Sequence, residues 1–167
     1  MTQRRVSASA ISGTLKYLRL LYEYVFVDCV PGLNEHNFPA VENADKIYLI
    51  STTEIPSLRN VARVLDYINR QDRGSEICQV VVNRYNSKFI TISDTQIEKA
   101  IRKGIHLRIP NQYSEVIKSV NTGNPLVLSA RSDFARALGT WADSLMQKPV
   151  TGAPKKATRG VLGILGM

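Results

Sequence analysis

The stretch YVFVDCVPGLN at residues 24–34 decides the fold of this chain. Its first four residues are aromatic or aliphatic and suit a buried strand, which ends on the carboxylate of Asp28. Pro31 and Gly32 follow at once, and a Pro-Gly pair favours a turn. In α/β domains that hydrolyse nucleotides, such a strand brings an acid to the carboxyl edge of the sheet, beside the phosphates and Mg²⁺.

This kind of domain also needs a phosphate-cradling loop of the form G-x-x-x-x-G-K-[ST], normally on the first strand. Only residues 1–23 precede the predicted strand, and none of them forms that loop. The most similar sequence, GTLK at residues 13–16, falls inside a predicted helix with no strand before it. We therefore expect the chain to be the C-terminal part of a nucleotide-binding domain, truncated at its N-terminus.

The composition suits one folded domain with a hydrophobic core, since 44% of the 167 residues are hydrophobic. The formal charge of +8 suggests nucleic acid as a partner. However, part of this charge lies near the two ends of the chain, at Arg4, Arg5, Lys148, Lys155, Lys156 and Arg159. Basic ends of this kind are typical of solvated tails, and the interleaved basic and aromatic residues of an RNA-binding sheet are missing.

The cysteines and histidines give no sign of a disulfide or a metal site. Cys29 and Cys78 fall in predicted strands and suit small buried residues of a reducing compartment. His36 and His106 have no partner at ligand spacing. No run approaches the ~20 apolar residues of a membrane span, so we expect a cytoplasmic protein.

Helix and strand patterns alternate along the chain. Short apolar runs predict strands at residues 24–28, 46–51, 77–82 and 105–109. Helical spacing predicts helices at residues 8–22 and 35–43, from Pro56 to Gly74, from Ser93 to Gly104, from Asn111 to Gly123, and across 134–145. Ser93 and Gln96 form the pattern of a capping box. Alternation of this kind predicts a doubly wound, mostly parallel sheet with helices on both faces, a three-layer architecture like that of the P-loop NTPases.

The same spacing predicts which side chains face the core. Four of them follow Pro56, at Leu58, Val61, Leu65 and Ile68. Further core positions are expected at Ile97, Ala100, Ile101, Val116, Ile117, Val120, Tyr17, Tyr22 and Trp141.

The domain is expected to span residues 1–148, and residues 149–167 form a flexible basic tail. The tail joins Lys and Arg to the apolar run VLGIL at residues 161–165, a pattern that would suit an amphipathic segment touching a membrane. Three glycines in its last eight residues oppose a helix, which favours a disordered end instead.

Four segments, in this order, resemble a known family: VFVDCVPGLNE, ADKIYLISTTEIPSLRNVARVLD, VVNRYNS and IPNQYSEVIKSVNTGNPLV. They are similar to the CpaE/TadZ pilus-assembly ATPases, relatives of MinD and ParA in the deviant Walker P-loop group. The resemblance covers about residues 10–146. It implies an ATP-dependent dimer, with ATP and Mg²⁺ as cofactors, that positions and assembles Flp/Tad (type IVb) pili.

The resemblance also implies roles for residues of the first segment. Asp28 would hold Mg²⁺ through water and position the attacking water. Gly32 would let backbone N–H groups approach the γ-phosphate. Val30 stands where many relatives have a proline, so the shape of this loop differs from theirs. The local alternative is that Asp28 caps the turn that follows it.

Two further pairs would form the pocket for the base. Asn83 can donate to and accept from adenine, and Arg84 can stack on it or close the pocket. Pro110 and Asn111 would complete the pocket. The local alternatives are a polar strand end for the first pair and a turn with a helix cap for the second.

The segment EIPSLRN holds Glu54, Ser57 and Arg59, which in dimeric relatives lie near the partner subunit and the switch. The alternative is a solvent-facing first turn of a helix. In the family's sheet the strand that carries the phosphate loop lies between residues 24–28 and residues 46–51. Without this strand the sheet must either close the gap or leave apolar edges open, and open edges favour association or aggregation.

We therefore expect this chain to be a weak ATPase, or none, when alone. Its expected partners are a second copy or a full-length paralogue, together with pilus-assembly proteins. One alternative is a non-catalytic module that binds such a partner, placed at a cell pole or a membrane through it. Another is a ParA-like DNA-partitioning protein that binds nonspecific DNA through its basic surface.

Overall fold

A computed structural model describes residues 6–32, 34–35, 37–71, 74–86, 92–128 and 132–146. In these ranges the chain forms a three-stranded parallel sheet of order β1-β2-β3. The strands are β1 (Ile47–Ser51), β2 (Cys78–Tyr85) and β3 (Ile105–Pro110). The predicted tail at 149–167 lies outside the described ranges.

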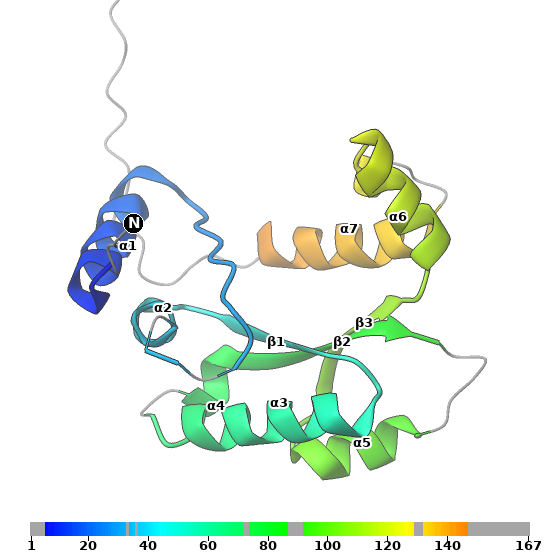
Figure 1. The fold of residues 1–167 in the computed structure, drawn as a ribbon, viewed down its shortest axis with the longest axis horizontal. Coiled ribbons are helices and arrows are strands. Elements are labelled where there is room, and N and C mark those ends of the chain that lie inside the picture. Colours follow the sequence, from blue (N-terminus) through cyan, green and yellow to red (C-terminus); the bar gives the residue numbers. More distant parts are fainter. Residues whose placement is uncertain are drawn as a thin grey trace, which may run out of the picture.

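Helices cover both faces of the sheet, as predicted (Figure 1). The helices are α1 (Ala8–Leu21), α2 (Phe38–Asn43), α3 (Ile55–Ile68), α4 (Gly74–Ile77), α5 (Asp94–Ile101), α6 (Tyr113–Thr122), the short 3-10 helix η1 (Leu126–Leu128) and α7 (Asp133–Met146). Figure 1 shows α3 and α5 below the sheet, and α7 above it. None of the helices in the described ranges is long and apolar enough to cross a membrane.

The main core lies between the sheet and the pair α3 and α5. Its buried members are Leu58, Val61, Leu65, Ile68, Cys78, Val80, Ile97 and Ile101. All four apolar positions predicted on α3 are therefore confirmed. The central strand β2 is buried on both faces, because Val80, Val81 and Val82 are each at most 3% exposed. On the other face, Trp141 of α7 packs edge-on against Tyr48, with ring centroids 5.0 Å apart.

Some predicted helix ends are confirmed and others are wrong. Ser93 and Gln96 form a complete capping box, and Gly123 ends α6 with a left-handed φ of +67°. However, α5 ends at Arg102, which takes the left-handed φ of +54° itself, so Gly104 is not the residue that ends it. Gly74 does not end α3 either: it opens α4, with its backbone against the carbonyl of Ile68.

The predicted strand at residues 24–28 is wrong. Residues 24–30 pair with none of the three strands, and Phe26 is 75% exposed. The cause lies in the sheet order: β1 is an edge strand, and no described strand lies beside it to bridge to residues 24–28. Cys29 of the same segment is exposed and not buried as predicted, whereas Cys78 is buried.

Several residues predicted in the core are exposed. Tyr17 and Tyr22 are 60% and 59% exposed, because α1 packs mainly on α2 and not on the sheet. Ile117 and Val120 of α6 are 39% and 69% exposed, because this helix contacts mainly η1. Ala100 is also exposed. Helical spacing identifies an apolar face, but it does not show whether another element covers that face.

Candidate nucleotide-binding edge

The carboxyl ends of β2 and β3 lie side by side. Tyr85 pairs with Pro110 across the two strands, and the backbone N–H of Asn111 donates a 2.9 Å hydrogen bond to the carbonyl of Tyr85. Asn83 and Arg84 therefore end on the same sheet edge as Pro110 and Asn111. The structure brings together all four residues predicted for the base pocket.

Asn83 and Arg84 lie in β2 at an irregularity in its register with β3, between Val82 and Tyr85. Arg84 has a φ of +52°, a left-handed conformation that is uncommon for a residue other than glycine. The side-chain Oδ1 of Asn83 accepts a 2.8 Å hydrogen bond from the backbone N–H of Arg84. This leaves the Nδ2 group of Asn83 without a partner among the described residues, so it can donate to a ligand.

A polar network fixes this edge to α5, and the sequence analysis missed it. The hydroxyl of Tyr85 donates to Asp94 Oδ1 at 3.0 Å. Arg108 Nε donates to Asp94 Oδ2 at 2.8 Å, and its guanidinium lies over the Tyr85 ring, 6.0 Å from the centroid. Partial burial and the Asp94 carboxylate raise the pKa of Tyr85. The sequence signal for this network is Asp94, an acid in the first turn of α5.

Asp28 and Gly32 lie on a different segment. Asp28 is exposed, and its carboxylate makes no hydrogen bond or ion pair within the described ranges. Gly32 has a left-handed φ of +88°, which explains the glycine at this turn. No hydrogen bond between described residues joins either of them to the ends of β2 and β3.

Asn37, which precedes α2, holds this turn in place. The side chain is 7% exposed, and its Nδ2 group donates to the carbonyls of Val30 and Gly32 at 2.7 and 2.8 Å. Sequence reasoning did not single out Asn37, because an Asn in a loop has many roles. An Asn at a helix start five residues after a Pro-Gly turn could have indicated such a contact.

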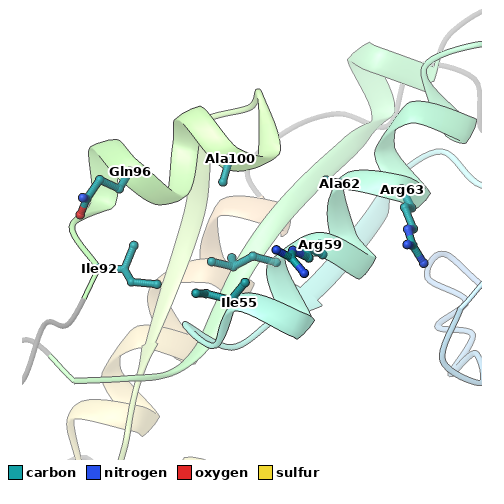
Figure 2. Close-up of a pocket in the computed structure, with 8 residues that line it drawn as sticks. Ile55, Arg59, Ala62, Arg63, Ile92, Gln96 and Ala100 are labelled. Carbon is teal, nitrogen blue, oxygen red and sulfur yellow. The ribbon is translucent and has the colours of Figure 1, made fainter.

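Ser57 and Arg59 of the EIPSLRN segment have different surroundings. Ser57 Oγ lies 3.0 Å from Ser51 Oγ and accepts a 3.1 Å hydrogen bond from the N–H of Thr52, so it fixes the turn from β1 to α3. Arg59 instead lines a groove between α3 and α5, where Figure 2 shows it beside Ile55.

The residues at these strand ends suit the base of a nucleotide, but the chain has no matching loop for the phosphates. The strand ends offer an amide donor, a guanidinium and a proline ring, which suit the edge and the face of a base. For the phosphates, the chain has no Gly-Lys-Ser or Gly-Lys-Thr run. Within the described ranges no three His, Cys, Asp or Glu side chains gather as metal ligands. The chain therefore offers candidate contacts for the base, a candidate half-site, and it carries no phosphate loop of this form.

Comparison with known proteins agrees with this architecture, although no family model matches the chain. The septum site-determining protein MinD of Bacillus subtilis is 28% identical over 130 residues, which cover 76% of this chain and 48% of that protein. A putative MinD of Oltmannsiellopsis viridis is 32% identical over 113 residues, covering 66% of this chain and 35% of that protein. The chain thus spans about half or less of the length of these relatives.

Solved structures give the same result for the fold. A ParA family ATPase from Chlorobium tepidum matches with a TM-score of 0.75 at 21% identity, covering 84% of this chain and 57% of that chain. MinD in the MinC:MinD cell division complex of Aquifex aeolicus matches with a TM-score of 0.76 at 23% identity, covering 86% and 61%.

The chain has the fold of the MinD/ParA type of P-loop ATPase. More particularly, its curated relatives are MinD proteins at low identity. The names of these relatives do not include CpaE or TadZ, so the resemblance to the pilus-assembly branch stays a prediction.

Proposed function

We propose that the chain is the C-terminal portion of a MinD/ParA-type ATPase that positions and assembles Flp/Tad pili in the manner of CpaE and TadZ. One observation supports the nucleotide part of this proposal: Tyr85, which follows Asn83 and Arg84, pairs with Pro110 and accepts a hydrogen bond from Asn111. The pilus role rests on the four sequence segments and their order.

In this proposal the sheet edge binds the adenine base and a separate element supplies the phosphate loop. Asn83 Nδ2 donates to the base, and the Arg84 guanidinium covers its face. Asp28 serves Mg²⁺ and the attacking water once the phosphates are held, and Gly32 approaches the γ-phosphate. The partner that supplies this loop is a full-length paralogue, because a second copy of this chain also lacks the loop. The chain alone is then a weak ATPase or an inactive one.

Septum positioning is the second candidate, because the curated relatives are named as septum site-determining proteins. One solved relative is in complex with MinC. A MinD-like role would give this chain a cell-division partner in place of pilus proteins.

Deletion of the gene in its own host separates the two candidates. The pilus role predicts cells without Flp pili in electron micrographs and with septa in normal positions. Minicells together with normal pili would reject the pilus role and favour septum positioning. A plasmid copy carrying Asn83→Ala should fail to restore the lost phenotype, whereas Asn121→Ala, at the exposed end of α6, should restore it.

A third candidate, binding of nonspecific DNA, is favoured only by the ParA-type fold and the charge of +8. It predicts DNA affinity that falls steeply with salt, because binding releases counterions from the phosphates. Fluorescence anisotropy with a labelled duplex at low and moderate salt tests this: affinity that does not change would reject it.

A further inference from the structure

A groove of about 380 Å³ lies between α3 and α5, on the side of the sheet away from α7 (Figure 2). It is lined by Ile55, Leu58, Arg59, Ala62, Arg63, Ile92, Gln96 and Ala100. This groove is separate from the carboxyl ends of β2 and β3, and none of the four base-pocket residues lines it.

The lining of the groove is mainly apolar and partly open to solvent. Ile55 is 54% exposed, whereas Leu58 is 4% exposed and belongs to the core. Ala62 and Ala100 contribute only methyl groups, one from each helix. Because these side chains are small, they leave space between α3 and α5. Ala100 lines this space and is exposed, so it is not part of the core.

The charged residues that line the groove are both positive, and no ion pair among the described residues balances them. Arg59 and Arg63 are four residues apart on α3, so they lie on one face of the helix, one turn apart. Both are exposed, and neither makes an ion pair or a side-chain hydrogen bond in the described part of the chain. Gln96 is the remaining polar residue of the lining and carries no charge.

The acids nearest in sequence to the groove residues of α5 are already engaged elsewhere. Asp94 accepts from Tyr85 and pairs with Arg108. Glu98 accepts a 3.0 Å hydrogen bond from the backbone N–H of Ile105. These two acids of α5 therefore pair with groups other than Arg59 and Arg63, and in the described part of the chain both guanidinium groups can pair with a carboxylate of another molecule.

The groove walls decide which kind of segment fits. Both walls are helices, whose backbone groups are bonded within each helix, so an added strand would find no backbone partners there. A helix satisfies its own backbone and can set an apolar ridge into the groove.

We propose that the groove between α3 and α5 binds an amphipathic helix of a partner protein, with leucine-like residues in the groove and carboxylates against Arg59 and Arg63. This surface goes beyond the proposed function and does not depend on nucleotide binding. Its partner is recognised by an acidic flank beside an apolar face, a combination that matches both the lining and the charge.

The probe is a fluorescein-labelled helical peptide of about 14 residues, long enough to span the four turns of α3. It carries Leu at helical spacing on one face and Glu along one flank, and a matched peptide carries Lys in place of Glu. Fluorescence anisotropy on the full chain should show the Glu peptide binding about tenfold or more tightly than the Lys peptide. The double variant Arg59→Glu, Arg63→Glu should reverse this preference.

The charge-reversal variant Lys118→Glu, on the exposed surface of α6, is the matched control and should keep the preference for the Glu peptide. If the double Glu variant is unfolded by circular dichroism, Arg59→Gln with Arg63→Gln serves instead and should remove most of the discrimination. Equal binding of the two peptides, or a preference that survives in the variants, would overturn the proposal. So would failure of both peptides to bind while the variants convert a dimer to a monomer in sedimentation, because the groove would then hold a second copy.

Discussion

The backbone N–H of Asn111 donates a 2.9 Å hydrogen bond to the carbonyl of Tyr85, and this bond joins the carboxyl ends of β2 and β3. Through it, Asn83 and Arg84 near the end of β2 lie at the same carboxyl end of the sheet as Pro110 and Asn111. Arg108, in the strand before Asn111, ties the same edge to α5 through Asp94. The two strand ends are therefore held by each other and by α5. This support favours a binding site for a planar ligand that is formed before the ligand binds.

This edge is expected to bind adenosine weakly even without a phosphate loop. Titration with adenosine, followed by ¹H–¹⁵N correlation spectra, should move the amide signals of residues 83–85 and 110–112. Asn83→Ala should reduce these shifts, because it removes the amide donor to the base. Asn121→Ala is the control and should leave them unchanged. Shifts confined to the groove between α3 and α5, or no shifts at all, would count against the base pocket.

Gly74→Ala should destabilise the fold strongly. A Cβ atom added at Gly74 would lie 1.7 Å from the carbonyl oxygen of Ile68, so the backbone would have to move. We expect a loss of about 3 kcal/mol or more in the free energy of unfolding, measured with urea. Gly13→Ala is the matched control, since a Cβ there meets no atom within 4 Å in an exposed part of α1. It should be neutral or stabilise by about 0.5–1 kcal/mol; equal losses in both variants would contradict the packing.

The Cys78 thiol should make stability depend on pH in the alkaline range. Burial raises the pKa of Cys78 from 9.0 to about 11, and the Lys103 ammonium opposes this rise. Between about pH 9 and pH 11 the native state thus keeps a proton that the unfolded chain loses, so the free energy of unfolding falls as pH rises. In a Cys29→Ala background, Cys78→Ala should lessen this fall by about 2 kcal/mol in urea melts. An unchanged slope would show that the thiol is not protected.

The free edge of β1 is expected to promote association. Ile50 is 62% exposed on this edge strand, and unpaired edges with apolar side chains pair with other chains. Ile50→Lys should lower the average mass in sedimentation equilibrium and change the free energy of unfolding by only about 0.5 kcal/mol. Leu20→Lys, on the 69% exposed Leu20 of α1, is the control and should leave the mass unchanged. If both variants act alike, general apolar contact and not the edge drives association.

Much of the fold could be predicted because local patterns and packing agree. Some features follow from the spacing of residues within one helix or strand. They are the buried positions of α3, the capping box of Ser93 and the burial of β2 on both faces. The parallel pairing of β2 and β3 also followed from the alternation of strands and helices, and it puts the carboxyl ends of these two strands side by side.

The errors lie where the outcome depends on a neighbour. Residues 24–28 have the composition of a strand, but a strand also needs hydrogen-bonding partners, and β1 pairs only with β2 in the described part of the chain. Tyr17 and Val120 have correct helical spacing, yet they stay exposed because α1 contacts mainly α2 and α6 contacts mainly η1 among the described elements. The contacts of Asn37 with Val30 and Gly32 depend on the shape of a loop, which spacing does not encode.

The most direct test of the half-site is isothermal titration calorimetry of the full chain with ATP and Mg²⁺, with Asp28→Ala and Asn83→Ala alongside. We predict no binding in the micromolar range for any of the three proteins, because the chain carries no phosphate loop to hold the triphosphate. Micromolar binding by the natural chain that is lost in both variants would contradict it. Such a result would mean that the chain completes a whole nucleotide site by itself.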